Sequence, residues 1–156
     1  MAVGYRLVKR KWADSAFSGD GARRYGGRWN GRGYSCVYLA ASESLALLEV
    51  MVHLDSYALL RHYRLFRVEI PDEAIEVLTS EDLPENWRDD SPPEDTALVG
   101  NAWLEREDPG LALAVPSVIV PREVNYILNP IHPAYEKIVG KALELDFEPD
   151  SRLTTG

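Results

Sequence analysis

The amino-acid sequence predicts a compact α+β protein, a mixed fold of short strands with a few helices. Short runs of β-branched and aromatic residues recur along the chain, and two longer segments have the composition of helices. No repeat, coiled-coil heptad or low-complexity tract interrupts them. The 156 residues are enough for one hydrophobic core, so we expect a single domain over residues 1–156.

The strands are predicted from alternating side chains and from the residues that break the alternation. The first strand carries Arg6 at its centre, and the second carries Tyr38. Pro121 separates two strands in the C-terminal half. The predicted strands are residues 3–8, 34–40, 64–70, 115–120, 124–128 and 143–147, the last of them at an edge of the sheet.

Two helices are expected, each with a capping residue at its start. Ser42 suits the N-cap of a helix that ends near His53, and Thr96 suits the N-cap of one that ends near Glu107. The centre of the first helix is apolar in every position except Glu49. A helix that is apolar all round is usually buried, so the sequence predicts one isolated, buried carboxylate.

Two long connections lie between these elements. Residues 12–33 contain six glycines, and an ordered loop of this length is usually functional. Residues 81–95 are acidic and rich in proline, which is typical of a solvated surface loop.

Composition limits the class of protein and its partners. The net charge of −8 argues against nucleic acid as the main partner, because phosphate contacts need a basic surface. The single cysteine, Cys36, excludes an internal disulfide and a thiolate metal cage. No apolar run has the length of a membrane span and no signal peptide is evident, so we expect a cytoplasmic protein. The basic residues are enriched early in the chain, at Arg6, Lys9, Arg10, Lys11, Arg23, Arg24, Arg28 and Arg32.

Glu49 and Arg28 are the main candidates for chemistry. Glu49 is either a general base or stabiliser of a developing cation, or an ordinary glutamate that is solvated or paired. His53 follows one turn later, but nothing completes a metal-binding set, so we expect no metal. Arg28 follows two glycines and can grip a pyrophosphate, or it is a surface arginine beside a turn. Trp29 either stacks on a ligand ring or is packed in the core.

Four further residues are candidates for binding. Tyr38 contacts a ligand or simply packs in its strand, and Arg6 binds an anion or forms a salt bridge. Ser117 lacks the glycine-flanked elbow of a serine hydrolase. Asn125 satisfies backbone groups or contacts a ligand.

Taken in order, these motifs resemble the RES domain, the toxin half of a bacterial toxin–antitoxin pair. The arginine, glutamate and serine for which the family is named fall at Arg28, Glu49 and Ser117. Supporting motifs are Tyr5-Arg6-Leu7, Val37-Tyr38-Leu39-Ala40, Asn125, Asn129-Pro130 with His132-Pro133, and Asp150-Ser151-Arg152-Leu153.

The resemblance implies a fold related to the ADP-ribosyltransferase toxins and an activity that consumes NAD⁺. It implies NAD⁺ as a substrate rather than a cofactor, cleaved by a glycohydrolase or phosphorylase, with Glu49 beside the developing oxocarbenium ion. Arg6 and Arg28 would neutralise the pyrophosphate, Tyr38 would contact nicotinamide or ribose, and Ser117 would position the substrate. The implied partner is an Xre-type helix-turn-helix antitoxin, with a homodimer inside the complex and nucleic acid contacted only through the antitoxin.

Two alternatives stay open. A protein mono-ADP-ribosyltransferase is one, although arginine-directed enzymes commonly carry an acidic residue where this chain has Leu47. The other is a non-catalytic module that only binds the antitoxin. The intact Arg28, Glu49 and Ser117 argue against this second alternative.

Overall fold

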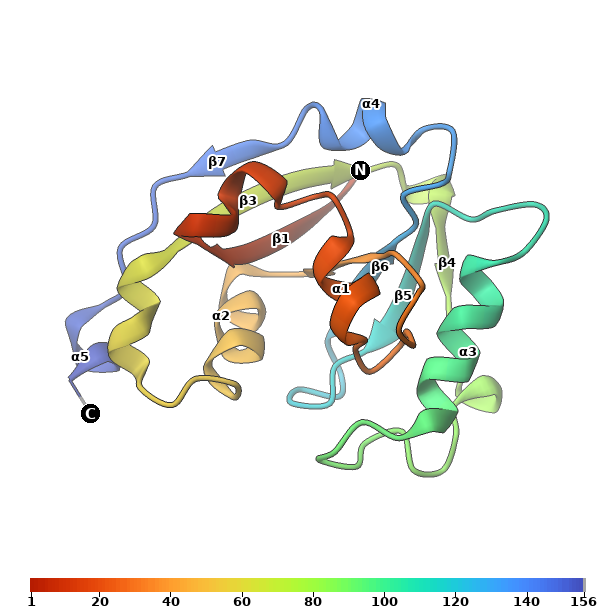
Figure 1. The fold of residues 1–156 in the computed structure, drawn as a ribbon, viewed down its shortest axis with the longest axis horizontal. Helices are drawn as coiled ribbons and strands as arrows, with labels where there is room; N and C mark the ends of the chain where they lie inside the picture. Colours follow the sequence, from red (N-terminus) through yellow and green to blue (C-terminus); the bar gives the residue numbers. More distant parts are fainter. Residues whose placement is uncertain (156) are drawn as a thin grey trace.

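A computed structural model describes residues 1–155 and shows one seven-stranded sheet with short helices around it (Figure 1). The strand order is β4-β5-β6-β2-β1-β3-β7, and every neighbouring pair is antiparallel except β4 with β5. The strands are β1 Ala2–Lys9, β2 Val37–Ala40, β3 Tyr63–Ile70, β4 Ile75–Val77, β5 Ala112–Pro116, β6 Val124–Leu128 and β7 Leu143–Leu145. The predicted α+β class of short strands and few helices is confirmed.

The sheet is divided between β1 and β2. Eight residue pairs join β1 to β3, whereas a single pair, Tyr5 with Ala40, joins β1 to β2. Figure 1 shows β1 and β3 running away from β5 and β6 beyond this point. Gly4 sits at the divergence, where a Cβ atom would lie 2.6 Å from Cδ1 of Leu39. The sheet therefore opens next to β2, and side chains rather than backbone bonds fill the gap.

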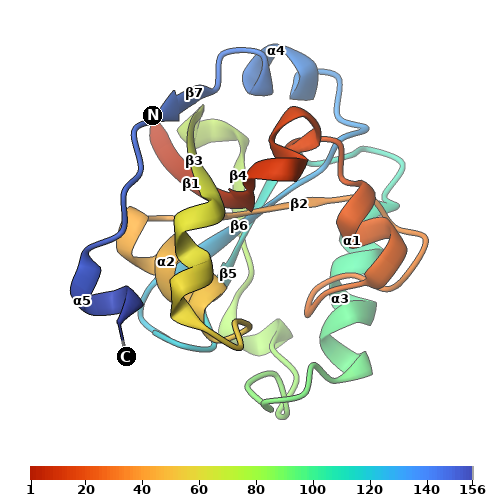
Figure 2. The same cartoon turned by 60° about the vertical axis from the view of Figure 1, so that its left-hand side comes forward.

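Helices flank both parts of the sheet, as the turned view in Figure 2 shows. The α-helices are α1 Asp20–Tyr25, α2 Glu43–Met51, α3 Glu94–Leu104, α4 Tyr135–Val139 and α5 Ser151–Thr154. The 3-10 helices are η1 Arg10–Ser15, η2 Tyr57–His62, η3 Asp72–Ala74 and η4 Ser80–Asp82. No helix in residues 1–155 combines the length and apolar character needed to cross a membrane.

The helix that carries Glu49 begins as predicted but is not buried all round. The Ser42 hydroxyl accepts a hydrogen bond from the backbone N–H of Leu45, as an N-cap does. Only Leu45 and Ala46 are buried, in a cluster with residues of β1, β2 and β3. Leu48 is exposed, so the expectation of a fully buried helix is wrong: α2 covers the sheet with one face only.

Two further local predictions are wrong. In both places a side-chain hydroxyl forms hydrogen bonds that the sequence pattern did not predict. The predicted strand 115–120 ends at Pro116, because the Ser117 hydroxyl accepts hydrogen bonds from the N–H groups of Ile119 and Val120 and folds a turn. Thr96 is not the N-cap of α3, which begins at Glu94; its hydroxyl donates to the Arg28 carbonyl at 2.6 Å.

Several short elements were not expected from the sequence. The glycine-rich stretch 12–33, predicted as loop, contains the end of η1 and all of α1. The three-residue strand β4 and the short helices α4 and α5 carry no periodic signal of their own. The predicted strand 34–40 is shorter than expected and begins at Val37.

Candidate active site

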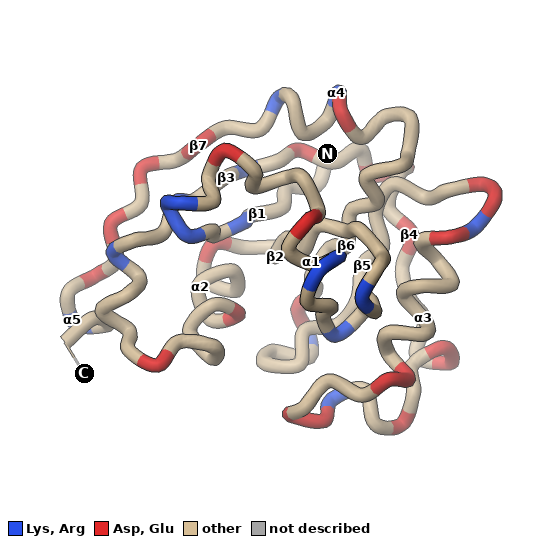
Figure 3. The backbone as a smooth tube through the Cα atoms, in the orientation of Figure 1, with Lys and Arg blue, Asp and Glu red and all other residues tan. Residues whose placement is uncertain are grey.

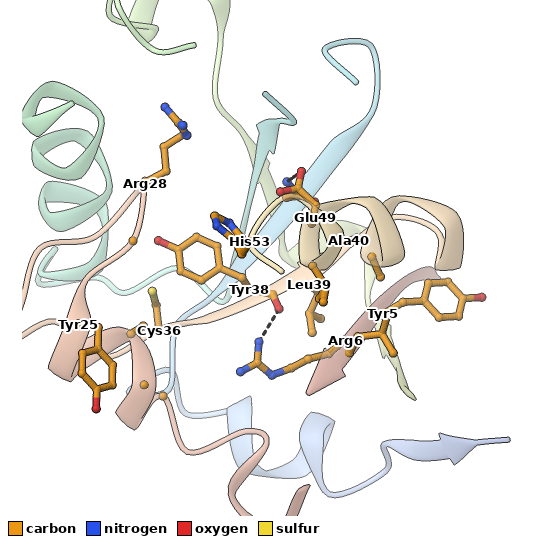
Figure 4. Close-up of a pocket in the computed structure, with 18 of the residues that line it drawn as sticks. Tyr5, Arg6, Tyr25, Arg28, Cys36, Tyr38, Leu39, Ala40, Glu49 and His53 are labelled. Atoms are coloured by element: carbon orange, nitrogen blue, oxygen red, sulfur yellow. Dashed lines mark hydrogen bonds between the residues drawn. The ribbon is translucent and has the colours of Figure 1, made fainter. Parts of the chain in front are cut away.

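A cavity of about 510 Å³ lies where the sheet opens between β1 and β2. Figure 4 shows the side chains around it. Arg6 comes from β1, Tyr38 from β2, Glu49 from α2 and Asn125 from β6, while Arg28 comes from the turn after α1. The structure thus brings five of the six predicted site residues to one cavity, and the sixth, Ser117, contacts it through Glu49.

The Glu49 carboxylate is held through one oxygen and left open at the other. Its Oε1 accepts hydrogen bonds from the Ser117 hydroxyl at 2.7 Å and from Nδ2 of Asn125 at 2.9 Å. Since the Ser117 oxygen already accepts from two backbone N–H groups, its own hydrogen is directed to Glu49. Within residues 1–155 no donor contacts Oε2, so this oxygen is available to a ligand.

Only one of the two polar atoms of the Asn125 side-chain amide forms a hydrogen bond in the described part of the chain. Its nitrogen donates to Glu49, but its Oδ1 is buried and has no hydrogen-bond partner in the described part of the chain. A buried carbonyl without a donor is unfavourable by about 1–3 kcal/mol. Because Asn125 lines the cavity, a hydroxyl or amide group of a bound ligand could satisfy this oxygen.

Tyr38 is fixed by its hydroxyl group, which leaves its ring for contacts in the cavity. The hydroxyl donates to Oδ1 of Asn30 at 2.6 Å and accepts from the backbone N–H of Trp29 at 3.1 Å. Gly27 makes room for it, since a Cβ there would lie 2.8 Å from the hydroxyl oxygen. Burial raises the pKa of Tyr38 well above its ordinary value, so the side chain stays neutral. Trp29 is 3% exposed and packed in the core, not presented to a ligand.

Arg28 is held at the cavity wall by the acidic loop. Its guanidinium donates to the carbonyl oxygens of Trp87 at 2.9 Å and Asp90 at 3.4 Å. Partial burial lowers the pKa of Arg28, and the nearby negative charge of Glu49 opposes that shift. The loop predicted to be only solvated surface is therefore also the clamp that orients a cation toward the cavity.

Arg6 spans the opening in the sheet. Its Nε donates to the Ala16 carbonyl at 2.7 Å and its Nη1 to the Tyr38 carbonyl at 3.0 Å, the bond drawn as a dashed line in Figure 4. Within residues 1–155 no carboxylate forms an ion pair with it. Burial lowers the pKa of Arg6. The side chain therefore bonds one backbone carbonyl of β2 and one just after η1, and it keeps an uncompensated positive charge at the cavity.

Sequence reasoning missed Asn30, which organises the turn around Arg28. Asn30 is 1% exposed; its Nδ2 lies within hydrogen-bond distance of the carbonyls of Ala22, Gly31 and Tyr34, while its Oδ1 accepts from Tyr38. Its position in a glycine-rich turn was the only local signal. The structure also places His53 on the cavity wall. No three His, Cys, Asp or Glu side chains in residues 1–155 are grouped so as to hold a metal ion.

Comparison with known proteins finds one family that covers most of the chain. Residues 4–150 match the RES domain family. A protein named Toxin Res from Yersinia enterocolitica is 44% identical over 149 residues, covering 96% of this chain and 97% of the relative. A Prs ADP-ribosylating toxin from Sphingobium is 41% identical over 127 residues, covering 80% of this chain and 78% of the relative.

The fold is also found in a solved structure. The crystal structure of the M. tuberculosis MbcT-MbcA toxin-antitoxin complex contains a chain that superposes with a TM-score of 0.67 at 24% identity, covering 92% of this chain and 84% of that one. This likeness concerns the fold alone. The family match over residues 4–150 and the identities above 40% settle the affiliation that the motifs predicted: the chain belongs to the RES domain family.

Proposed function

We propose that the protein is a toxin that cleaves the bond between nicotinamide and ribose in NAD⁺. The observation that carries this proposal is the geometry of Glu49, whose Oε1 is fixed by two donors while Oε2 stays open in a cavity that also presents Arg6, Arg28 and Tyr38. When the bond breaks, its electron pair leaves with nicotinamide and positive charge develops on the ribose. A fixed carboxylate stabilises that charge without reorganising during the reaction.

The other residues fit the remaining parts of the dinucleotide. Arg6 and Arg28 supply positive charge for the pyrophosphate, with Arg6 at the opening of the sheet and Arg28 at the wall. The ring of Tyr38 offers a face on which nicotinamide can stack. Oδ1 of Asn125 can accept a hydrogen bond from a ribose hydroxyl. In hydrolysis, water adds to the ribose carbon and loses a proton, giving ADP-ribose and neutral nicotinamide.

Purified protein incubated with NAD⁺ tests the proposal directly. The wild type is expected to release nicotinamide, and Glu49→Gln to lose about 10²–10³-fold of this rate, as is usual when one such electrostatic group is removed. Glu43→Gln is a matched control, because Glu43 is exposed on the same helix and does not line the cavity. Equal release by wild type and Glu49→Gln would refute the proposal.

The acceptor can be water, phosphate or a protein, and the relatives give one reason to test the third. The Sphingobium relative bears the name of an ADP-ribosylating toxin, which favours protein mono-ADP-ribosyl transfer as a second candidate function. Leu47, two positions before Glu49, departs from the acidic residue common in arginine-directed enzymes. Chromatography separates free ADP-ribose from its phosphorylated form, whereas labelled NAD⁺ with cell lysate marks a modified protein.

We further propose that an antitoxin of the Xre helix-turn-helix type neutralises this activity in the cytoplasm. The solved toxin-antitoxin complex with the same fold supports an antitoxin partner. A homodimer inside the complex, with DNA bound only by the antitoxin, accords with the net charge of −8. Growth arrest upon expression, relieved by the antitoxin or by Glu49→Gln, tests this part.

A further inference from the structure

Two further cavities adjoin the Glu49 cavity near the C-terminal half of β1. A second cavity of about 690 Å³ shares Arg6, Glu49 and His53 with the first and extends to Lys11 and Trp12. A third, also about 690 Å³, shares Lys9, Lys11, His53 and Tyr63 with the second. His53 borders all three, so the three cavities adjoin one another around this side chain, and together they are called the groove.

The wall of this groove is basic although the protein is acidic. Figure 3 shows a continuous blue stretch at the end of β1, which is Lys9-Arg10-Lys11. All three side chains are exposed, and none forms an ion pair within residues 1–155. In a chain with a net charge of −8, these cations form a local site for a negatively charged ligand.

The acidic residues on the same walls do not cancel this charge. The second and third cavities together carry five cations, Arg6, Lys9, Arg10, Lys11 and Arg24, and three carboxylates, Asp20, Glu49 and Asp55. One of these carboxylates is already paired, since Asp20 lies 3.5 Å from Arg23, whereas Glu49 accepts only from the neutral groups of Ser117 and Asn125 and keeps its charge. Glu49 and Asp55 therefore remain to oppose the five cations, and the cations stay in excess.

Apolar side chains line the groove together with the cations. Trp12 is 57% exposed and Leu59 45%, although large apolar side chains favour burial. The Lys11 ammonium lies 5.2 Å from the centre of the Trp12 ring, so the two present one mixed cationic and aromatic surface. A small inorganic anion would use only the cations. An extended peptide with acidic and apolar side chains would contact both kinds of group over the length of the groove.

We infer that this groove binds an acidic segment of a protein that receives ADP-ribose and brings its accepting side chain to Glu49. The inference rests on the proposed cleavage of NAD⁺ and names the class of acceptor. In the transfer, a nucleophilic atom of the acceptor bonds to the ribose carbon and gives its proton to water. The electron pair of the broken bond leaves with nicotinamide. Specificity comes from the acidic and apolar residues around the accepting side chain.

Fluorescence anisotropy with a short synthetic peptide tests the groove. The probe combines several glutamates with one phenylalanine, and a second peptide carries glutamines instead. The double variant Lys9→Glu/Lys11→Glu is expected to bind the acidic probe about tenfold more weakly than the wild type, which corresponds to about 1.4 kcal/mol. Lys137→Glu/Lys141→Glu, with the same change of charge on exposed residues outside the groove, is the matched control and is expected to bind as the wild type does. Melting curves verify that both variants fold.

The outcomes separate the docking inference from the proposed function. Glu49→Gln is expected to bind the probe at least as tightly as the wild type while failing to cleave NAD⁺. Wild-type protein that cleaves NAD⁺ but binds acidic and glutamine peptides equally would overturn the docking inference alone. The docking inference would also be overturned by two results found together: inorganic phosphate displaces the probe, and the protein binds a probe with glycine in place of phenylalanine with the same affinity. Binding without NAD⁺ cleavage would overturn the proposed function, and with it the assignment of the bound segment as an acceptor of ADP-ribose, while the groove would stand as a site for an acidic peptide.

Discussion

The Ser117 hydroxyl donates a hydrogen bond of 2.7 Å to Oε1 of Glu49, although the two residues are 68 positions apart in the sequence. Ser117 lies in the turn after β5 and Glu49 on α2, so this bond fixes the helix that carries the carboxylate against the far part of the sheet. Ser117 and Glu49, two of the three residues for which the family is named, are thus joined by a direct hydrogen bond.

Ser117→Ala is expected to lower kcat for NAD⁺ cleavage by about 10–100-fold, because the carboxylate loses one of its two donors and its position. Two N–H groups, of Ile119 and Val120, also lose their acceptor, so we expect unfolding to become easier by about 1–3 kcal/mol. Ser44→Ala, an exposed serine on α2, serves as the control. A normal kcat with a lowered melting temperature would show that Ser117 acts on the fold alone.

Gly100→Ala is expected to destabilise the protein by about 3 kcal/mol or more, because a Cβ on α3 would collide with the backbone of Trp29. Backbone cannot move aside as a flexible side chain can, and Trp29 is next to Arg28, so the cavity wall should shift as well. For a chain of this size the melting temperature should fall by about 6–12 °C.

Gly21→Ala is the matched control for that substitution. Gly21 lies in α1, and an added Cβ meets no atom within 4 Å. Since alanine favours a helix over glycine by about 0.5–1 kcal/mol, this variant should be slightly more stable than the wild type. Similar melting temperatures for the two variants would contradict the close packing of α3 on Trp29.

The strands and the Glu49 helix could be predicted because their signals are local. Alternating side chains mark β1, β3 and β6, and Ser42 marks the start of α2. The false strand at 118–120 came from β-branched residues whose backbone N–H groups bond the Ser117 hydroxyl instead of a neighbouring strand. The local residue pattern cannot reveal whether these N–H groups bond the hydroxyl or a neighbouring strand, because the outcome depends on the geometry of the turn.

The candidate site was predictable only in part. The resemblance placed Arg28, Glu49 and Ser117 in one family motif, but nothing in their spacing shows that Ser117 bonds Glu49 or that Arg28 bonds the loop at Trp87. The single residue pair between β1 and β2, which creates the cavity, is a tertiary feature of a sheet whose strands are not in sequence order.

The Cys36 thiol is expected to resist alkylation at pH 8 until the protein unfolds. Cys36 is 1% exposed, and burial raises its pKa to about 12 from an ordinary value of 9.0. Because the unfolded chain gives up this proton first, the contribution of Cys36 to stability is constant at neutral pH and falls once the pH exceeds about 9. At pH 10 the loss from this group is about 1.4 kcal/mol.

Denaturant unfolding at several pH values measures this loss. The Cys36→Ala variant should lack the additional decrease in stability between pH 8 and 10, although it loses some packing at every pH. An identical pH dependence in the variant and the wild type would rule out the buried thiol as its source.

Arg28→Ala is expected to loosen the acidic loop, because the carbonyls of Trp87 and Asp90 lose the guanidinium that binds them. Loss of the shorter of the two bonds, to Trp87, is worth about 1.5 kcal/mol and by itself raises the open population of the loop by about tenfold. Trypsin should therefore cut faster after Arg88, and the KM for NAD⁺ should rise. Arg32→Ala, an exposed arginine that makes no hydrogen bond to the loop, is the control, and equal cleavage rates in both variants would contradict the clamp.

Arg6 can be tested for two separable contributions, to the sheet and to the pyrophosphate. Arg6→Met removes the hydrogen bond across the opening to Tyr38 and the one to Ala16 after η1, and it leaves both carbonyls without this donor, so we expect a loss of about 2–4 kcal/mol in stability. Arg6→Lys keeps the charge but cannot donate to both carbonyls with the fixed fork of a guanidinium. If the charge holds the pyrophosphate, the KM for NAD⁺ should rise much more in Arg6→Met than in Arg6→Lys, measured below the melting temperature of both. An equal KM in the two variants, with only the melting temperatures lowered, would assign Arg6 to the fold and leave Arg28 as the pyrophosphate-binding cation.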